Sequence, residues 1–232
     1  MTASTSLENI GYELVQETFS QEEVRMMREL ILEDRGPATY LQRLAQRLLV
    51  SYVGDEVIDF MARPSDSWSR LSQMLSNRIL PMVQKKFGED VDFGFHNDIG
   101  INMANAWHKD ILGNGVRIGF MYNISLAKFE THDLWQKAGE DEYSIYKCCI
   151  YLNTPRRNDG LRIVPGSHRD RHITADSIEK HDVIRPRPGD ILLFDQRVTH
   201  KGVRSERFSM EDRVLISIGF GKRNVFTHNF AQ

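Results

Sequence analysis

The feature that most constrains the fold is a change of character after Gly88. Helical patterns give way there to short runs rich in β-branched and aromatic residues. Turn signals separate these runs at Asn158–Gly160, Pro165–Ser167 and Pro188–Asp190. Short strands at this spacing favour an antiparallel sandwich or jelly roll over a parallel sheet. The predicted strands are Val91–Phe95, Ile99–Met103, Val116–Asn123, Ser144–Asn153, Leu161–Val164, Val183–Ile184, Ile191–Phe194 and Val214–Phe220.

The region before Gly88 predicts a helical layer. A short strand, Tyr12–Val15, precedes a helix whose start carries the capping-box residues Ser20 and Glu23. A second amphipathic stretch covers residues 55–61. A third helix starts near Asp66 or Ser67, with apolar positions at helical spacing, an expected kink at Pro81 and an end at Gly88: Trp68, Leu71, Leu75, Ile79 and Val83.

Composition narrows the range of partners. Lys and Arg number 30 against 32 Asp and Glu, so no basic excess favours nucleic acid or an anionic membrane. No apolar run approaches the roughly 18 residues of a membrane span, and the N-terminus lacks the pattern of a secretory signal. The two cysteines, Cys148 and Cys149, are neighbours that a strand would point to opposite faces, which predicts reduced thiols. We therefore expect a cytoplasmic monomer or homodimer that acts on a small molecule.

The clearest chemical signal is a His-x-Asp pattern that occurs three times. The pairs are His96/Asp98, His108/Asp110 and His168/Asp170. Two histidines and one carboxylate form a facial triad that holds Fe(II) and leaves coordination positions open. Such a triad needs a third ligand from a distant strand. His200 fits, because it follows the strand Ile191–Phe194 and a turn. We expect the strand beginning at Arg213 to run antiparallel beside this segment.

The last predicted strand has two different faces. Its apolar face is expected to pack against the helices: Val214, Ile216, Ile218 and Phe220. The other face mixes Arg213 and Ser217 with Leu215 and Gly219, which suits the wall of a polar cavity. A buried arginine requires an anion, and a dicarboxylate cosubstrate would supply one. From spacing alone, Arg213 fits equally well in solvent or paired with Asp212 or Glu211.

These motifs together resemble a known enzyme family. The matching stretches are Trp107–Asp110, Asn158–Arg169 and Pro188–Gly202, and the opening residues 11–24 fit as well. They resemble the phytanoyl-CoA dioxygenase family of non-haem Fe(II)/2-oxoglutarate oxygenases. The resemblance implies a mainly β fold: a double-stranded β-helix (jelly roll, cupin-like) with N-terminal helices packed on its major sheet. It predicts one domain over residues 1–232, helical to about residue 90 and a β core over about 91–222.

The resemblance also implies roles for individual residues. It implies that the iron ligands and catalytic residues are His108, Asp110 and His200. It also implies that Arg213 binds the distal carboxylate of 2-oxoglutarate. Arg204 and Arg207 lie nearer to His200 in the chain, but they fall in a polar loop.

Further positions near the cosubstrate follow from the same resemblance. Many relatives carry a hydroxyl residue where this chain has Gly202, and Ser217 is a substitute. On the strand Ile145–Asn153, the resemblance implies that Lys147 and Tyr151 face the cavity, where they would touch cosubstrate or substrate. The alternative for Lys147 is the solvent end of the strand. Asn102 is a further pocket candidate.

The implied activity is oxidation of a substrate C–H bond with Fe(II), 2-oxoglutarate and O₂, releasing succinate and CO₂. Hydroxylation is the expected outcome, with desaturation or ring formation as variants. Two rivals stay open: a metal-dependent enzyme of the same fold that does not use 2-oxoglutarate, and a non-catalytic β-sandwich binding module. A polar insert at residues 128–143, with Phe129, Leu134 and Trp135 embedded, is expected to form a lid; a surface excursion away from the site is the alternative.

Overall fold

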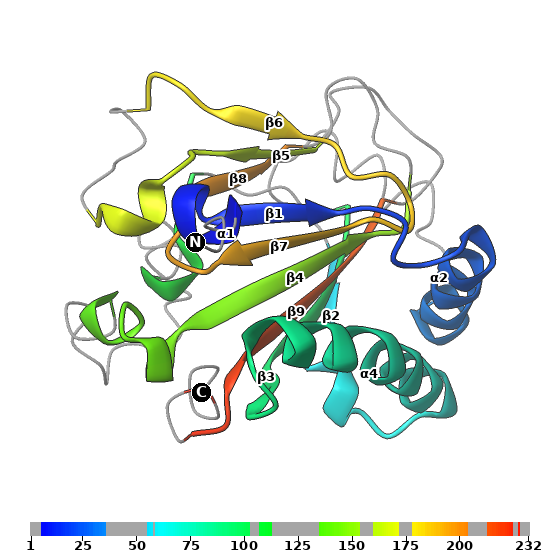
Figure 1. The fold of residues 1–232 in the computed structure, drawn as a ribbon. Coiled ribbons are helices and arrows are strands. Elements are labelled where there is room, and N and C mark those ends of the chain that lie inside the picture. Colours follow the sequence, from blue (N-terminus) through cyan, green and yellow to red (C-terminus); the bar gives the residue numbers. More distant parts are fainter. Residues whose placement is uncertain are drawn as a thin grey trace, which may run out of the picture.

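Two antiparallel sheets face each other, and helices cover the outer side of the larger one (Figure 1). The computed structural model describes residues 6–35, 55–57, 59–102, 107–112, 135–153, 160–171, 178–203, 213–224 and 227. The six-stranded sheet has the order β1-β7-β4-β9-β3-β2, and the three-stranded sheet has the order β6-β5-β8. The strands are β1 (Tyr12–Val15), β2 (Asp55–Val57), β3 (Val91–Ile101), β4 (Ile145–Tyr151), β5 (Gly160–Ile163), β6 (Asp182–Ile184), β7 (Ile191–Asp195), β8 (His200–Val203) and β9 (Val214–Lys222).

Capping residues mark the start of one long helix and the end of the other. They are α1 (Ser6–Ile10), α2 (Gln21–Arg35) and α4 (Asp66–Phe87), with single 3₁₀ turns at η1 (Phe60–Ala62), η2 (Asp110–Leu112), η4 (Asp141–Tyr143) and η5 (Ser167–Arg169). The capping box before α2 is confirmed: the Ser20 N–H donates to Glu23 Oε2 at 2.7 Å, and the Glu23 N–H donates to Ser20 Oγ at 3.2 Å. Helix α4 continues through Pro81 and ends at Gly88, whose φ of 117° favours glycine.

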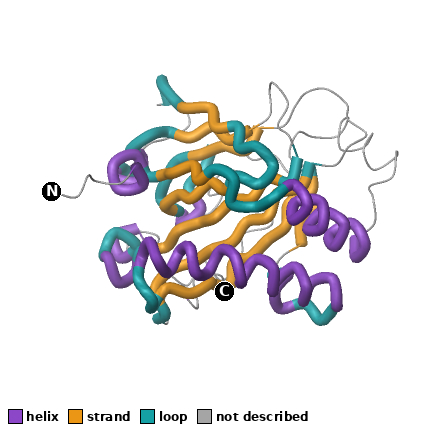
Figure 2. The backbone as a smooth tube through the Cα atoms, turned by 45° about the vertical axis from the view of Figure 1, so that its right-hand side comes forward, coloured by secondary structure: helices purple, strands orange, loops and turns teal. Residues whose placement is uncertain are grey.

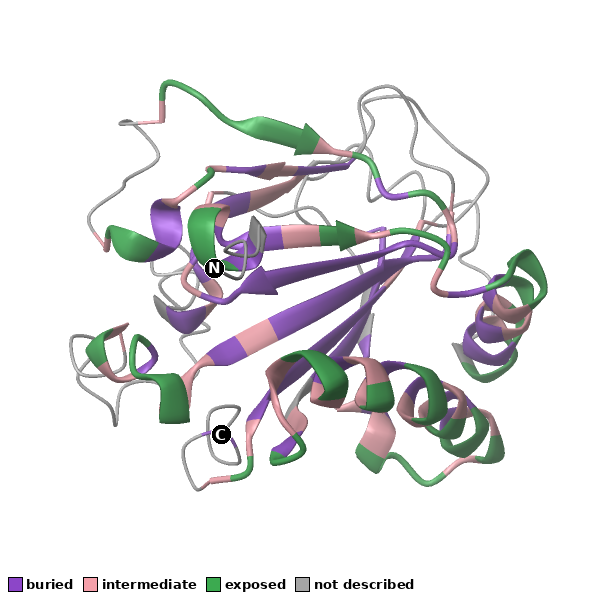
Figure 3. Cartoon of the chain, in the orientation of Figure 1, coloured by how far each residue is buried: buried purple, intermediate pink, exposed green. Residues whose placement is uncertain are grey.

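The main core lies between these helices and the outer face of the large sheet (Figure 2). Residues Leu71, Leu75 and Ile79 of α4 are fully buried there. The apolar face predicted for the last strand joins the same core, through Val214, Ile216, Ile218 and Phe220. Figure 3 shows the result, with α4 exposed on its outer side and strand β7 buried along its length. The prediction that helices pack on the larger sheet is confirmed.

A second, smaller core lies between the two sheets. It combines Tyr12 of β1, Phe194 of β7 and Tyr151 of β4 with Leu161 and Ile163 of β5. At one edge, the Tyr12 hydroxyl donates to the Asp182 carboxylate and joins β1 to β6. The neighbouring cysteines divide between the two cores: Cys148 belongs to the outer one and Cys149 to the inner one. Both thiols are free, as predicted.

The structure differs from the sequence expectation in three places. The two strands predicted over residues 91–103 are one strand, β3, with a register shift between Phe93 and Asn97. The amphipathic stretch from residue 55 divides into edge strand β2 and turn η1. Strand β9 lies between β3 and β4, so β4 separates it from β7, and His200 itself opens a strand of the other sheet.

The predicted strand Val116–Asn123 lies outside the described residues. Within the described residues, no helix has the length and apolarity needed to cross a membrane.

Candidate metal centre

Three side chains converge between the sheets. Oδ1 of Asp110 lies 3.2 Å from Nε2 of His108 and 3.6 Å from Nε2 of His200. All three ligand atoms lie within 4.8 Å of one another. Ligand atoms about 2.1 Å from a metal, at right angles to each other, are about 3 Å apart. The spacing of the three ligand atoms is therefore close to the spacing that a bound divalent ion requires.

Backbone pairing brings the two histidines together. His108 and His200 exchange both amide hydrogen bonds, at 3.0 Å and 2.9 Å, as an isolated antiparallel bridge. The ring centroids are 4.2 Å apart. The Ile111 N–H donates to the Gln196 carbonyl at 3.2 Å and continues the contact beyond Asp110. The segment carrying His-x-Asp is thus attached to the strand that carries the third ligand.

The surroundings of His200 leave its Nε2 available to accept a metal ion. Its Nδ1 lies 3.1 Å from the Val198 carbonyl, which can only accept, so Nδ1 carries the proton and Nε2 keeps its lone pair. Phe194 packs against the ring at a centroid distance of 4.8 Å. Burial, then the neighbouring His108, lowers the pKa of His200 to about 3, against the opposing effect of Asp110. The imidazole is neutral at physiological pH, as a metal ligand must be.

Asp110 is held as a carboxylate. Burial by itself raises its pKa, but Lys147, His200 and His108 together outweigh burial and keep the pKa well below its ordinary value. Nζ of Lys147 lies 2.8 Å from Asp110 Oδ2, the oxygen that does not face the histidines.

Lys147 does not lie at the solvent end of its strand, which is one of the two placements expected from the sequence. It is buried on β4, so the solvent-end placement is wrong. Its pKa is raised: burial lowers it, and Asp110, Cys149 and Asp98 reverse that effect.

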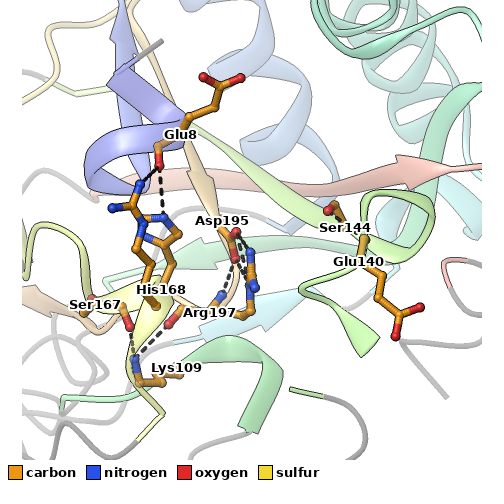
Figure 4. Close-up of polar contacts among 9 residues, drawn as sticks. Glu8, Lys109, Glu140, Ser144, Ser167, His168, Asp195 and Arg197 are labelled. Carbon is orange, nitrogen blue, oxygen red and sulfur yellow. Dashed lines mark hydrogen bonds and ion pairs between the residues drawn. The ribbon is translucent and has the colours of Figure 1, made fainter. Parts of the chain in front are cut away.

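Lys109, between the two ligands, points the other way. Its Nζ donates to the carbonyls of Ser167 at 2.7 Å and Arg197 at 2.9 Å (Figure 4). It therefore connects the ligand segment to η5 and to the turn before His200. Burial lowers the pKa of Lys109 to about 7, although Asp170 and Asp195 act in the opposite direction. Sequence reasoning missed this residue; the signal available was alternation, which turns residue 109 away from its two neighbours.

The described part of the insert touches this arrangement. The Trp135 ring lies 4.8 Å from Nζ of Lys109 and 5.9 Å from the guanidinium carbon of Arg197. Residues 128–134 of the insert, including Phe129 and Leu134, lie outside the described residues. The Trp135 contacts place this end of the insert near the ligand segment, and the lid stays a prediction.

The candidates for holding a cosubstrate lie along the inner side of the large sheet. Tyr151 is buried, and burial raises its pKa overall, although the Arg213 charge acts to lower it. Ser217 is buried, and apart from an interaction with the Cys149 thiol its Oγ has no hydrogen-bond partner among the described residues. Asn102 supports the backbone, since its Oδ1 accepts a hydrogen bond from the Arg213 N–H at 3.1 Å. A cation, a buried phenol and a hydroxyl with spare hydrogen-bonding capacity fit a carboxylate ligand.

The other two His-x-Asp pairs, His96/Asp98 and His168/Asp170, have different surroundings. His168 is structural, because it is buried and its Nε2 lies 3.3 Å from the Glu8 carbonyl (Figure 4). The side chain of His96 lies outside the described set. Asp98 is buried on β3 opposite Ser217, and its charge contributes to the raised pKa of Lys147. Sequence reasoning gave Asp98 no role at the site; the signal available was alternation, because Ile99 and Ile101 belong to the outer core and Asp98 takes the opposite face.

Comparison with known proteins gives a fold and no family. No protein-family model matches the sequence, and no curated protein matches it. Solved structures do match. One is SnoN, a non-heme alpha-ketoglutarate-dependent epimerase from nogalamycin biosynthesis, with a TM-score of 0.61 and 19% identity over 94% of this chain and 80% of that chain.

Two further structures agree. HygX from Streptomyces hygroscopicus, with nickel and 2-oxoglutarate bound, has a TM-score of 0.61 and 15% identity over 95% of this chain and 86% of that one. AviO1 from Streptomyces viridochromogenes has a TM-score of 0.59 and 14% identity over 94% of this chain and 92% of that one. The chain therefore has the fold of these enzymes.

Proposed function

We propose that this protein is an Fe(II)/2-oxoglutarate-dependent dioxygenase of the phytanoyl-CoA dioxygenase type. The observation that carries the proposal is the convergence of His108, Asp110 and His200 between two sheets. The fold shared with SnoN and HygX supports the same class. In this proposal the two sheets are a double-stranded β-helix, and residues 1–232 act as one domain.

The three ligands divide the work of holding the metal. The two histidines offer Nε2 lone pairs, one of them fixed by the Val198 carbonyl, and Asp110 offers Oδ1. Three protein ligands leave room for a chelating cosubstrate and O₂. When bound, Fe(II) with 2-oxoglutarate and O₂ supplies the oxidising power for C–H cleavage, and succinate and CO₂ are released.

The cosubstrate is assigned to the inner side of the large sheet. Arg213 binds its distal carboxylate, Ser217 donates a hydrogen bond, and Tyr151 lies within the electrostatic influence of Arg213. Asn102 fixes the backbone of Arg213. Lys147 contacts Asp110 and so acts from the metal side.

The substrate is proposed to be a small molecule of biosynthetic metabolism. HygX has been solved with hygromycin B bound and SnoN with nogalamycin RO, which supports a small-molecule substrate here. Hydroxylation of an unactivated C–H is the proposed outcome. Epimerisation is the second candidate, because SnoN is an epimerase. We propose a cytoplasmic monomer or homodimer that engages neither nucleic acid nor membrane.

Anaerobic titration tests the proposal. The metal-free protein should take up one Fe(II) per chain, and adding 2-oxoglutarate should produce a visible charge-transfer band. Addition of O₂ should then yield succinate. Metal binding without any response to 2-oxoglutarate would favour a metal enzyme of another type, and absence of metal binding would favour a binding module. Product analysis for a hydroxyl group or an inverted centre separates the two outcomes.

A further inference from the structure

The two oxygens of Asp110 face different groups. Oδ1 faces Nε2 of both histidines, at 3.2 and 3.6 Å. Oδ2 accepts a hydrogen bond from Nζ of Lys147 at 2.8 Å. A carboxylate can bind a metal through one oxygen or through both. The contact with Lys147 therefore bears directly on how Asp110 meets a metal.

Lys147 is firmly placed for this contact. Its strand, β4, is central in the large sheet, between β7 and β9. In register, Lys147 stands between Phe194 on β7 and Gly219 on β9. Gly219 carries no side chain, so the lysine side chain has no competitor on that flank. The Lys147 and Asp110 side chains are each only 11% exposed, so water competes little for either group.

We propose that Lys147 is the residue that restricts Asp110 to one-oxygen coordination. By holding Oδ2, the ammonium leaves only Oδ1 for the ion and keeps a coordination position available for the cosubstrate. The inference rests on the proposed function for the identity of the ion and the cosubstrate. It assigns Lys147 as a positioning residue that acts through Asp110, in contrast to the direct contact with cosubstrate or substrate expected from sequence.

The charge balance agrees with this role. Asp110 carries one negative charge into a buried site whose two histidines are neutral ligands. Before an ion binds, the ammonium of Lys147 balances that charge, and the Asp98 carboxylate also acts on Lys147. Groups that hold a metal ligand from behind fix its orientation and tune its donor strength.

The test uses Co(II) as a spectroscopic probe of the full-length metal-free protein, without 2-oxoglutarate. Lys147→Met removes the donor, and Lys147→Gln, which is too short to reach Oδ2, is the second variant should the first fail to fold. Lys147→Arg retains a donor and a positive charge. Lys86→Met is the matched control, because it removes a surface lysine that pairs with Glu13 at 2.7 Å.

The expected result is a changed Co(II) absorption spectrum in Lys147→Met and Lys147→Gln, with the wild-type spectrum kept in Lys147→Arg and Lys86→Met. The affinity for 2-oxoglutarate, measured afterwards, should fall about 10- to 100-fold in the first two variants. An unchanged Co(II) spectrum in Lys147→Met and Lys147→Gln would overturn the proposal. Lost 2-oxoglutarate affinity with that unchanged spectrum would assign Lys147 to the cosubstrate instead. Failure of the wild-type protein to bind Co(II) would overturn the proposed function as well.

Discussion

Two buried lysines adjoin Asp110, Lys109 in the sequence and Lys147 by contact from β4, and they have different partners. Lys109 donates to two backbone carbonyls and packs against the Trp135 ring. Lys147 donates to a carboxylate. Burial lowers the pKa of Lys109 to about 7, whereas the pKa of Lys147 stays raised despite its burial.

The difference shows that the partner decides what a buried cation does. Neutral carbonyls orient an ammonium without balancing its charge, so Lys109 serves to connect chain segments. A carboxylate balances the charge, so Lys147 forms part of the electrostatics of the site. The chain thus uses one residue type for attachment and for charge compensation around the same ligand.

Removing Asp110 or either histidine should have the largest effect. Asp110→Ala, like His108→Ala or His200→Ala, leaves two protein ligands and should abolish Fe(II) binding or nearly so. Asp110→Ala also removes the carboxylate that pairs with Lys147. Metal content after dialysis measures the loss. His96→Ala is the control and should keep its metal; equal loss in that variant would move the site to the other motif.

A third cation extends the comparison. Arg213 is proposed to bind the distal carboxylate of the cosubstrate, so it should affect cosubstrate binding and not metal binding. Arg213→Ala should weaken 2-oxoglutarate binding by about 2–4 kcal/mol and leave Fe(II) in place, because a bidentate charge pair is lost. Isothermal titration of the metal-loaded protein measures both properties. The same weakening in Arg204→Ala or Arg207→Ala, with Arg213→Ala unaffected, would reassign the anchor to the preceding loop.

Stability measurements sharpen the contrast at Lys109. Lys109→Met leaves the carbonyls of Ser167 and Arg197 without their donor and should lower the free energy of unfolding by about 1–3 kcal/mol. The loss should be present with and without metal, since Lys109 does not touch the ligand atoms. Urea denaturation with a constant m-value provides the measurement. A loss that vanished on metal addition would instead place Lys109 within the charge balance of the site.

The smallest effect is expected at Trp135. Trp135→Leu removes a ring that faces Lys109 at 4.8 Å and should cost about 0.5–1 kcal/mol of stability. In a Lys109→Met background the same substitution should cost less, because the cation is already gone. The double-mutant cycle isolates this pairing energy. Full additivity would show that Trp135 contributes only through packing.

Much of the molecule follows from patterns in the sequence. Successive side chains of a strand point to opposite faces of the sheet. Alternation along β4 and β9 therefore separates the residues that face the helices from Arg213, Ser217 and Lys147. The His-x-Asp motif and a distant histidine predict the three side chains that the structure brings together.

Other features depend on register and depth, which a pattern does not encode. The shift in β3 between Phe93 and Asn97 changes which residue of β9 stands opposite Asp98, and alternation does not predict that pairing. Alternation also gives the face of Lys147 but not its depth, so it does not predict burial against Asp110. The neighbours of β9 are set by long-range pairing, and adjacency in the chain suggests the wrong ones.

The two amide hydrogen bonds between His108 and His200 have a thermodynamic consequence. Their imidazoles are brought into proximity by strand pairing, so the conformational entropy of assembling the site is lost during folding and not at metal uptake. Metal should therefore enter a preorganised site quickly. Hydrogen exchange of these two amides should be slow before any ion is added, and only slightly slower afterwards.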